Sequence, residues 1–195
     1  MNCLRTLFVY LNYFRTLPAW LIIHCCRYSE KGIADVKAYL DHSDFKKLTF
    51  GLFSFSKLLM EEKSLRNVLL NRLHRNPILY MLFRILFRPM NTLYINMPPE
   101  NIGGGLSFQH GFSTIIAAEK IGENCRIYQQ CTIGYNGKEA PLIEDDCRIC
   151  CNSCVIGGVI LRSGCVVGAG SVVVKDVPKS SVVAGNPAKL IRTEV

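Results

Sequence analysis

His110 is the residue in this sequence best suited to acid–base chemistry. It lies in the stretch Phe-Gln-His110-Gly and is the only histidine in the C-terminal half of the chain. An alcohol is a weak nucleophile at neutral pH, and an imidazole that titrates at about 6.5 can take the proton of an attacking hydroxyl group. The alternative is a structural histidine hydrogen-bonded to neighbouring backbone. His74 precedes the breaker Arg75-Asn-Pro and is expected to be a surface residue.

Cysteine is the second residue type that could carry chemistry. The chain has ten cysteines, of which seven lie between residues 125 and 165. Cys147, Cys150, Cys151 and Cys154 include C-x-x-C spacings, which would suit a zinc site. Alternate residues of a strand point to opposite faces, however, and no further C-x-x-C or paired histidine follows this segment. We therefore expect buried reduced thiols, no metal, and a reducing cytoplasmic compartment.

An aliphatic residue recurs at every sixth position through the cysteine-rich region. The series is interrupted once and comprises Ile121, Ile127, Ile133, Ile143, Ile149, Val155, Leu161, Val167 and Val173. This period is too long for a single strand and out of step with a helix. It fits a solenoid in which each short strand occupies one face of a coil.

Two other repeat positions support a solenoid. The fifth residue of each repeat is small or slim, as a narrow coil requires: Cys125, Cys131, Cys147, Ser153, Val159, Cys165 and Ser171. The fourth residues are Asn124, Gln130, Asp146, Asn152, Gly158, Gly164 and Gly170. Asn, Asp and Gly tolerate a positive φ, so these positions are predicted to form the corners. A chance run of β-branched residues would leave the corners unexplained.

The largest irregularity in the repeats falls between Ile133 and Ile143. Ten residues separate these two positions, where a regular repeat needs six. The extra segment, from Gly134 to Pro141, is expected to leave the coil at one corner and to fold over a neighbouring groove. The coil itself is predicted from about residue 94 to 185, followed by a C-terminal tail.

The N-terminal half is predicted to be helical, and it carries all the excess positive charge. Up to residue 94 there are fourteen Lys and Arg against six Asp and Glu, and afterwards nine of each, which gives the net charge of +8. Helices are predicted at residues 29–40, with Ser29 as N-cap, and at 44–59, 64–74 and 77–87. The basic residues alternate with apolar ones and no nucleic-acid-binding motif is present, so nucleic acid is not expected as a partner.

Residues 4–26 are mostly apolar, but Arg15 and Pro18 interrupt them. A membrane span needs about 20 apolar residues in succession, so a transmembrane helix is not expected. The small-residue cleavage site of a signal peptide is also missing. Two interpretations remain, a helix packed on its neighbours or a helix that lies on a membrane surface. Residues 77–87, with Arg84 and Arg88 one turn apart, allow the same two interpretations.

Three segments of the repeat region resemble a known family. They are Gly-Gly-Leu-Ser-Phe-Gln-His110-Gly, then Tyr-Gln-Gln-Cys-Thr-Ile-Gly134-Tyr-Asn-Gly-Lys138, and the closing Asp176-Val-Pro with Gly185-Asn-Pro-Ala-Lys189. They resemble the hexapeptide-repeat acyltransferases, and among these the serine O-acetyltransferases and their relatives in polysaccharide gene sets. The resemblance implies an α+β fold, with a helical region over residues 1–90 and a left-handed parallel β-helix over residues 91–195.

The same resemblance implies an acetyl-CoA-dependent O-acetyltransferase. His110 would be the general base for a small hydroxyl-bearing acceptor, L-serine in the relatives that serve cysteine biosynthesis. Acetyl-CoA would lie along a groove formed mainly by backbone at Gly134, Cys151, Gly168 and Ala169. Lys189 or Arg192 would meet the nucleotide phosphates. A homotrimer or dimer of trimers in the cytoplasm is implied, with peripheral membrane contact through the N-terminal helices as an addition.

The chain differs from this family at several positions around the site. Ile95 replaces the carboxylate that orients the histidine in the family, and Gln109 replaces an acidic residue. The family's acceptor-binding Arg-His-Pro reads Glu139-Ala140-Pro141. Glu139 would repel the carboxylate of serine, so a sugar or polysaccharide hydroxyl is a second interpretation of the acceptor. A non-catalytic CoA-binding scaffold is a third interpretation.

Overall fold

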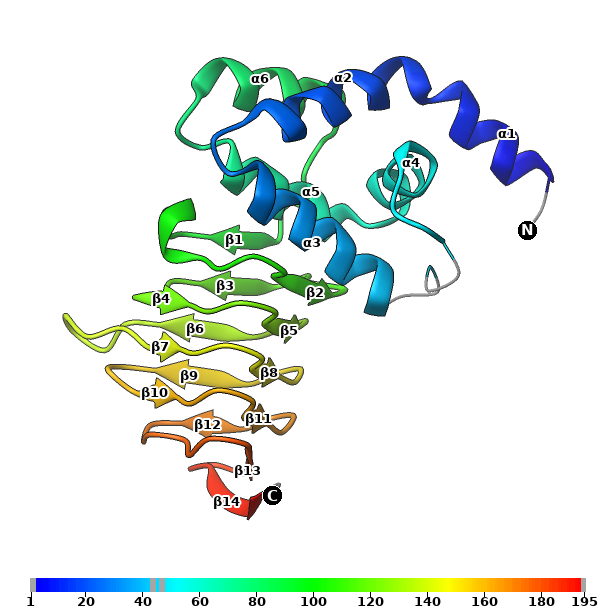
Figure 1. The fold of residues 1–195 in the computed structure, drawn as a ribbon. Helices are drawn as coiled ribbons and strands as arrows, with labels where there is room; N and C mark the ends of the chain where they lie inside the picture. Colours follow the sequence, from blue (N-terminus) through cyan, green and yellow to red (C-terminus); the bar gives the residue numbers. More distant parts are fainter. Residues whose placement is uncertain (1–2, 43–44, 46–47, 194–195) are drawn as a thin grey trace.

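The computed structural model describes residues 3–42, 45 and 48–193 of the chain. Its helices lie at one end of the molecule, and a stack of short strands forms the rest (Figure 1). The helices are α1 (Cys3–Leu11), α2 (Tyr13–Cys25), α3 (Ser29–His42), α4 (Leu52–Glu61), α5 (Lys63–Arg72) and α6 (Pro77–Leu86). A helical region followed by a parallel β-helix is the predicted fold class, which is confirmed.

The helices predicted after residue 28 are present, but one boundary is wrong. α4 begins at Leu52 and not at Asp44, which lies outside the described residues. Gly51 precedes the helix, and its N–H donates to Ser54 Oγ at 3.0 Å. Because glycine is a weak helix former and this contact caps the first turn, the helix starts only after Gly51. Ser29, predicted as an N-cap, is itself the first residue of α3.

The helices share one apolar core. Its most deeply buried large side chains are Phe55, Leu58, Leu59, Leu65, Leu69, Phe83 and Phe87. α5 occupies the centre, since it packs against α3, α4 and α6 and also contacts the first strands of the β-helix. The helical region therefore rests on the β-helix mainly through α5.

The β-helix consists of three sheets, one on each side of the coil (Figure 1). Sheet 1 contains β1 (Leu93–Ile95), β3 (Thr114–Ile116), β6 (Thr132–Gly134), β9 (Cys154–Ile156) and β12 (Val172–Val173). Sheet 2 contains β4 (Lys120–Ile121), β7 (Leu142–Ile143) and β10 (Ile160–Leu161). Sheet 3 contains β2 (Ser107–Gln109), β5 (Arg126–Tyr128), β8 (Arg148–Ile149), β11 (Val166–Val167), β13 (Ser181–Ala184) and β14 (Lys189–Thr193). All these pairings are parallel except that of β13 with β14, which closes the coil.

The repeat positions behave as the six-residue period predicts. Every aliphatic residue of the series is at most 1% exposed, and equivalent positions pair between coils, as Ile133 does with Val155. The slim fifth residues are also buried, and the thiols of Cys147 and Cys165 lie 3.6 Å apart inside the coil. Positive φ angles occur at Asn124, Gln130, Asp146, Asn152, Gly164 and Gly170. These corner predictions are confirmed.

One predicted corner is misplaced by a residue. Gly157, not Gly158, has the positive φ, at 83°. The loop after β6 packs here, because a Cβ at Gly157 would lie 3.2 Å from Asn136 Cβ and one at Gly158 would lie 3.1 Å from Glu139 Oε2. The repeat pattern could not predict the shift, since it depends on a loop inserted one coil earlier.

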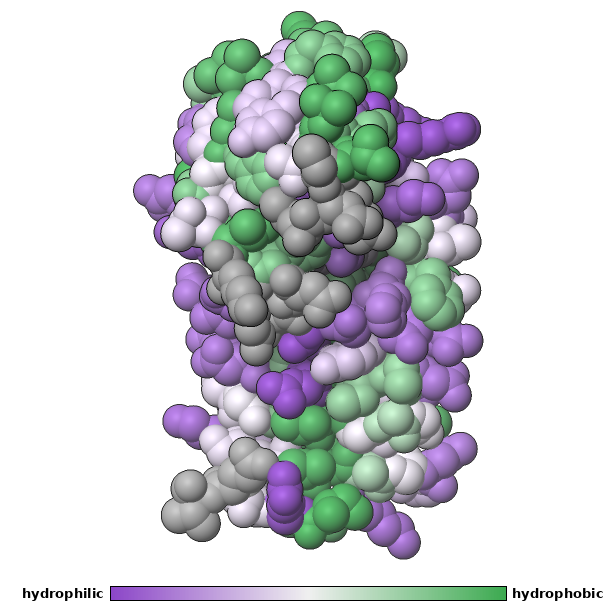
Figure 2. Space-filling view, turned by 90° about the vertical axis from the view of Figure 1, so that its right-hand side faces the viewer, coloured by the Kyte–Doolittle hydropathy of each residue, from purple (hydrophilic) through white to green (hydrophobic). Residues whose placement is uncertain are grey.

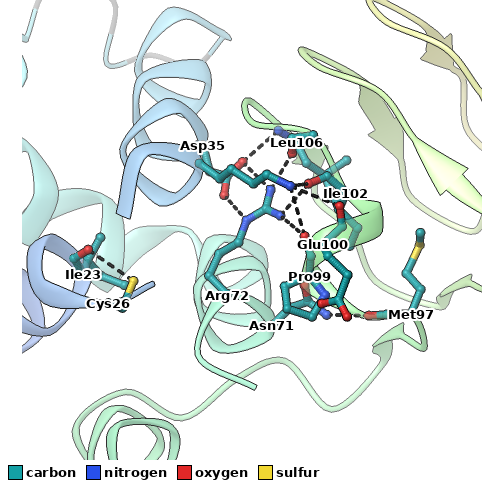
Figure 3. A network of polar contacts seen from close by, with 12 residues as sticks. Ile23, Cys26, Asp35, Asn71, Arg72, Met97, Pro99, Glu100, Ile102 and Leu106 are labelled. Carbon is teal, nitrogen blue, oxygen red and sulfur yellow. Dashed lines mark hydrogen bonds and ion pairs between the residues drawn. The ribbon is translucent and has the colours of Figure 1, made fainter. Parts of the chain in front are cut away.

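A buried ion pair joins the helices to the first coil (Figure 3). Arg72 Nε of α5 lies 2.9 Å from Asp35 Oδ2 of α3, and both side chains are fully buried. Arg72 also donates to the carbonyl oxygens of Ile102 and Gly103, at 3.0 and 2.6 Å. Asp35 Oδ1 accepts the N–H of Leu106 at 2.9 Å. The guanidinium and the carboxylate thus satisfy backbone groups just before β2 and fix its position relative to the helices.

Three helices leave apolar side chains exposed at the far end of the molecule. α1, α2 and α6 contribute Leu4, Leu7, Phe8, Leu11, Phe14, Leu17, Leu21, Ile78, Met81, Leu82 and Ile85. In Figure 2 much of the helical end of the visible face is apolar. Within the described residues, none of the helices combines the length and hydrophobicity that crossing a bilayer would require.

Candidate active site

The corner that carries His110 belongs to a continuous edge between sheets 3 and 1. Four stacked corners form this His110 edge, at residues 110–113, 129–131, 150–153 and 168–171. Backbone hydrogen bonds connect the corners in turn. They run from Gln130 N–H to Phe112 O at 2.9 Å, from Asn152 N–H to Gln129 O at 3.1 Å, and from Gly170 N–H to Cys151 O at 2.9 Å.

His110 is exposed at the first corner of this edge. It has a φ of 66°, and Gly111 follows with a φ of 69°. A Cβ at Gly111 would lie 3.1 Å from Ser64 Cβ, so α5 closes over the corner and leaves room only for glycine there. Phe108 holds β2, the strand that leads into this corner. Its ring lies in the β-helix core, and its N–H donates to Tyr39 Oη at 3.1 Å. Buried contacts on both sides therefore hold the backbone that carries the exposed imidazole.

Three of the predicted CoA-binding residues lie on the His110 edge. They are Cys151, half-buried, and the pair Gly168 and Ala169 one coil further on. Neighbouring coils are about 4.8 Å apart, so these corners extend from the imidazole as a narrow track. Gly168 is in close contact with the next coil, because a Cβ there would lie 2.9 Å from Ala184 Cβ.

Lys189 continues the same edge. It is exposed on β14 and pairs with Ala184, the last residue of β13, directly beneath the Gly168 corner. Lys189 is therefore at the end of the track opposite His110. Arg192 lies on the same strand, paired with Val182.

Gly134 does not lie on the His110 edge. It is the last residue of β6, so it stands at the opposite side of sheet 1, where the chain turns towards sheet 2. The following loop is held by hydrogen bonds between Asn136 and Glu139, at 2.9 and 3.3 Å. Glu139 and Ala140 line a surface hollow of about 620 Å³ on that side. Within one copy of the chain, this loop and His110 therefore lie on opposite sides of sheet 1.

A small cavity adjoins His110 beneath the helices. It has a volume of about 30 Å³ and is lined by Tyr39, Glu62, Ser107, Phe108, Gln109, His110 and Arg126. Arg126 Nη2 donates to Gln109 Oε1 at 2.5 Å, and its guanidinium carbon lies 5.4 Å from the centre of the Tyr128 ring. Glu62 could not be assigned to the site from the sequence, because it lies at the junction of α4 and α5 and reaches the site only through the fold.

The seven cysteines of the β-helix lie in two environments. Cys125, Cys131, Cys147 and Cys165 are inside the coil, whereas Cys150, Cys151 and Cys154 are half-buried near the His110 edge. Burial raises the pKa of the Cys131 thiol to about 11. In the part of the chain that the structure describes, no three His, Cys, Asp or Glu side chains are arranged to hold a metal ion.

Comparison with known proteins supports the resemblance predicted from the motifs. No protein-family model matches the chain. Serine acetyltransferase 2 of Arabidopsis thaliana is 40% identical over 100 residues, which cover 49% of this chain and 31% of that protein. The chain spans less than half the length of the first curated relatives that it matches.

Solved structures extend the likeness to the helices. The serine acetyltransferase of Neisseria gonorrhoeae superimposes with a TM-score of 0.65 at 27% identity, over 87% of this chain and 68% of that one. Soybean serine acetyltransferase complexed with serine gives 0.64 at 27% identity, over 84% and 69%. This chain is therefore similar in sequence to the serine acetyltransferases over about half of its length and has their fold over most of its length.

Proposed function

We propose that this protein is an acetyl-CoA-dependent O-acetyltransferase that uses His110 as its general base. The observation that carries the proposal is the placement of His110. Its exposed imidazole begins a single edge that continues through Cys151, Gly168 and Ala169 to Lys189. A long, thin thioester with phosphates at its far end fits such an edge, because backbone groups line its length and a cation stands at its end.

The proposed reaction moves one acetyl group and one proton. His110 takes the proton of the acceptor hydroxyl as that oxygen attacks the thioester carbonyl carbon. The tetrahedral intermediate then breaks its carbon–sulfur bond, which releases the acetyl ester and a CoA thiolate. The imidazolium returns its proton to the thiolate, so free CoA leaves and His110 is neutral again.

L-serine is the acceptor that the likeness favours, because the relatives are named for it and a soybean relative was solved with serine. Glu139 favours a neutral sugar hydroxyl as the competing acceptor, since its carboxylate would repel that of serine. Thioester consumption by the purified protein with serine, homoserine and a panel of sugars distinguishes the two. Turnover with none of these acceptors would reject the enzymatic proposal and leave a CoA-binding scaffold.

We also propose that the active protein is a homotrimer, or a dimer of trimers, in the cytoplasm. The loop with Glu139 and Ala140 stands across sheet 1 from His110, so a complete site needs that loop from a neighbouring copy. Gly134 would join the groove in the same way. Exposed apolar side chains on sheet 1, among them Tyr94 and Ile115, offer a surface for such a contact. Residues 91–195 would then form the catalytic domain.

For residues 1–90 we propose a role on the surface of an anionic membrane. The exposed apolar side chains of α6 recur at Ile78, Met81, Leu82 and Ile85, which is one face of a helix. The segments that form α1, α2 and α6 contain no Asp or Glu. Arg84 and Arg88 are exposed on or next to α6. An apolar face flanked by basic residues and free of carboxylates suits anionic lipid.

A further inference from the structure

A surface hollow lies between the helical region and sheet 1, and His110 is not among the residues that line it. We call it the α5–β1 groove. Residues of α5 and α6 form one wall, and β1 with Ile115 of β3 forms the other. α5 packs directly against β1 (Figure 1). The volume of about 670 Å³ is within the range of about 300–1,000 Å³ that is usual for small-molecule sites.

Two asparagines of α5 hold the walls of the groove together. Asn67 Nδ2 donates to the carbonyl oxygens of Met90 and Leu93, at 2.9 and 3.0 Å, and Asn67 Oδ1 accepts the N–H of Met90 at 2.8 Å. Asn71, one turn further along α5, donates to the carbonyl oxygen of Met97 at 2.9 Å. These bonds tie α5 to the chain on both sides of β1, so the groove is formed before any ligand binds.

Several polar groups of the groove have hydrogen-bonding capacity that the protein does not use. Asn71 Oδ1 is buried and has no hydrogen-bond partner. The side-chain amides of Asn91 and Asn96 are exposed and form no hydrogen bond within the described part of the chain. Each amide offers both donors and an acceptor. Hydroxyl groups of a ligand can therefore bond to all three side chains, and an unpaired buried oxygen gains most from such a donor.

A guanidinium group marks the helical end of the groove. Arg84 of α6 is exposed, and among the described residues it has no carboxylate partner. Its Nη1 donates to Tyr80 Oη at 3.3 Å, and the His74 ring meets the Tyr80 ring edge-on, with 6.4 Å between the centroids. The lining contains no Asp or Glu. The N–H fork of arginine matches a carboxylate or a phosphate group.

We propose that the α5–β1 groove binds a sugar that carries an oxyanion, such as a uronic acid or a sugar phosphate. The anionic group pairs with Arg84. The hydroxyl groups bond to the side-chain amides of Asn71, Asn91 and Asn96. This inference concerns binding alone and does not depend on the role of His110.

Calorimetry with the full-length protein, without lipid, tests the proposal. The probes are D-glucuronate and D-glucose 6-phosphate, which differ in their anionic group, and D-glucose is their neutral counterpart. The protein is used in its assembled form, because Tyr94 and Ile115 of the sheet wall would also face a neighbouring copy in the proposed trimer. One or both anionic sugars should bind at least about tenfold more tightly than glucose. If neither does, the proposal is overturned.

Two substitutions assign this binding to the groove. Arg84→Gln should raise the Kd of the anionic sugar at least about tenfold. Arg88→Gln is the matched control, because Arg88 is also exposed but does not line the groove, and its Kd should equal that of the wild type. Asn91→Ala should weaken binding of the sugar and leave binding of inorganic phosphate or acetate unchanged, because only a hydroxyl contact is lost.

Arg84 and Asn91 are exposed, so neither replacement disturbs the core. A Kd in Arg84→Gln equal to that of the wild type would overturn the proposal. So would inorganic phosphate or acetate that binds as tightly as the matching sugar, because the hydroxyl groups would then contribute nothing. Failure of the wild type to bind CoA would instead count against the proposed acetyltransferase, whatever the sugars give.

Discussion

The chemistry proposed for this protein depends on one exposed imidazole held by buried neighbours. His110 has a left-handed backbone conformation, and Gly111 repeats it under α5. Phe108 fixes the preceding strand in the β-helix core. The side chain can therefore face an acceptor at the surface while buried contacts hold its backbone. A general base needs this combination of access and fixed geometry.

At the same scale, the Asp35–Arg72 pair is predicted to be essential for stability. Asp35→Ala would leave the buried Arg72 guanidinium without its carboxylate and should cost about 3–5 kcal/mol in the free energy of unfolding. Urea denaturation followed by circular dichroism measures this. Arg75→Gln is the control, because it removes the exposed ion pair with Glu100 and should change stability very little. Equal effects of the two substitutions would refute the importance of the buried pair.

At the scale of elements, the Gly168 corner of the His110 edge is predicted to tolerate a larger side chain poorly. Gly168→Ala would place a methyl group 2.9 Å from Ala184 Cβ, so the last coils must move apart. We expect a cost of about 1–3 kcal/mol and weaker CoA binding, measured by thermal unfolding and calorimetry. Gly134→Ala is the control, because its nearest neighbour would be Ile156 Cδ1 at 4.0 Å. Stability of Gly168→Ala equal to that of Gly134→Ala would contradict the close approach.

The helices α1, α2 and α6 are predicted to bind anionic vesicles at low salt. Replacing Ile78 and Ile85 together with glutamate adds charge to the exposed face of α6 and should abolish cosedimentation with phosphatidylserine-containing vesicles. Replacing Leu190 and Ile191 together with glutamate makes the same change on exposed β14, and this variant should bind like the wild type. If the wild type does not cosediment with such vesicles at low salt, the exposed apolar faces of the helices form a protein–protein interface instead.

For the whole molecule, the separation of His110 from the loop of Glu139 predicts self-association. The chain has a mass of 21.9 kDa, and light scattering at micromolar concentration should give three or six times this value. A mixture of His110→Ala with a second inactive variant altered only in that loop should regain activity, because mixed trimers contain intact sites. A monomer that is fully active would contradict a shared site.

The sequence predicted the parts of the fold that depend on local contacts. In a solenoid each repeat contacts only its neighbours, so Ile133 or Cys131 could be assigned to the interior from its repeat position alone. Contacts between residues distant in sequence could not be predicted, because no repeat pattern relates their positions. The Asp35–Arg72 pair and the approach of Glu62 to His110 join separate regions, and the corner at Gly157 depends on a loop packed against it.

The most direct test of this account is acetyl transfer by His110→Asn. Asparagine tolerates the positive φ of this corner, so the substitution removes the base and keeps the backbone. With the best acceptor found, the rate should fall by about 10²–10⁴-fold, while the Kd for CoA stays the same because backbone groups form most of the groove. A transfer rate equal to that of the wild type would show that His110 is not the base and would contradict the account.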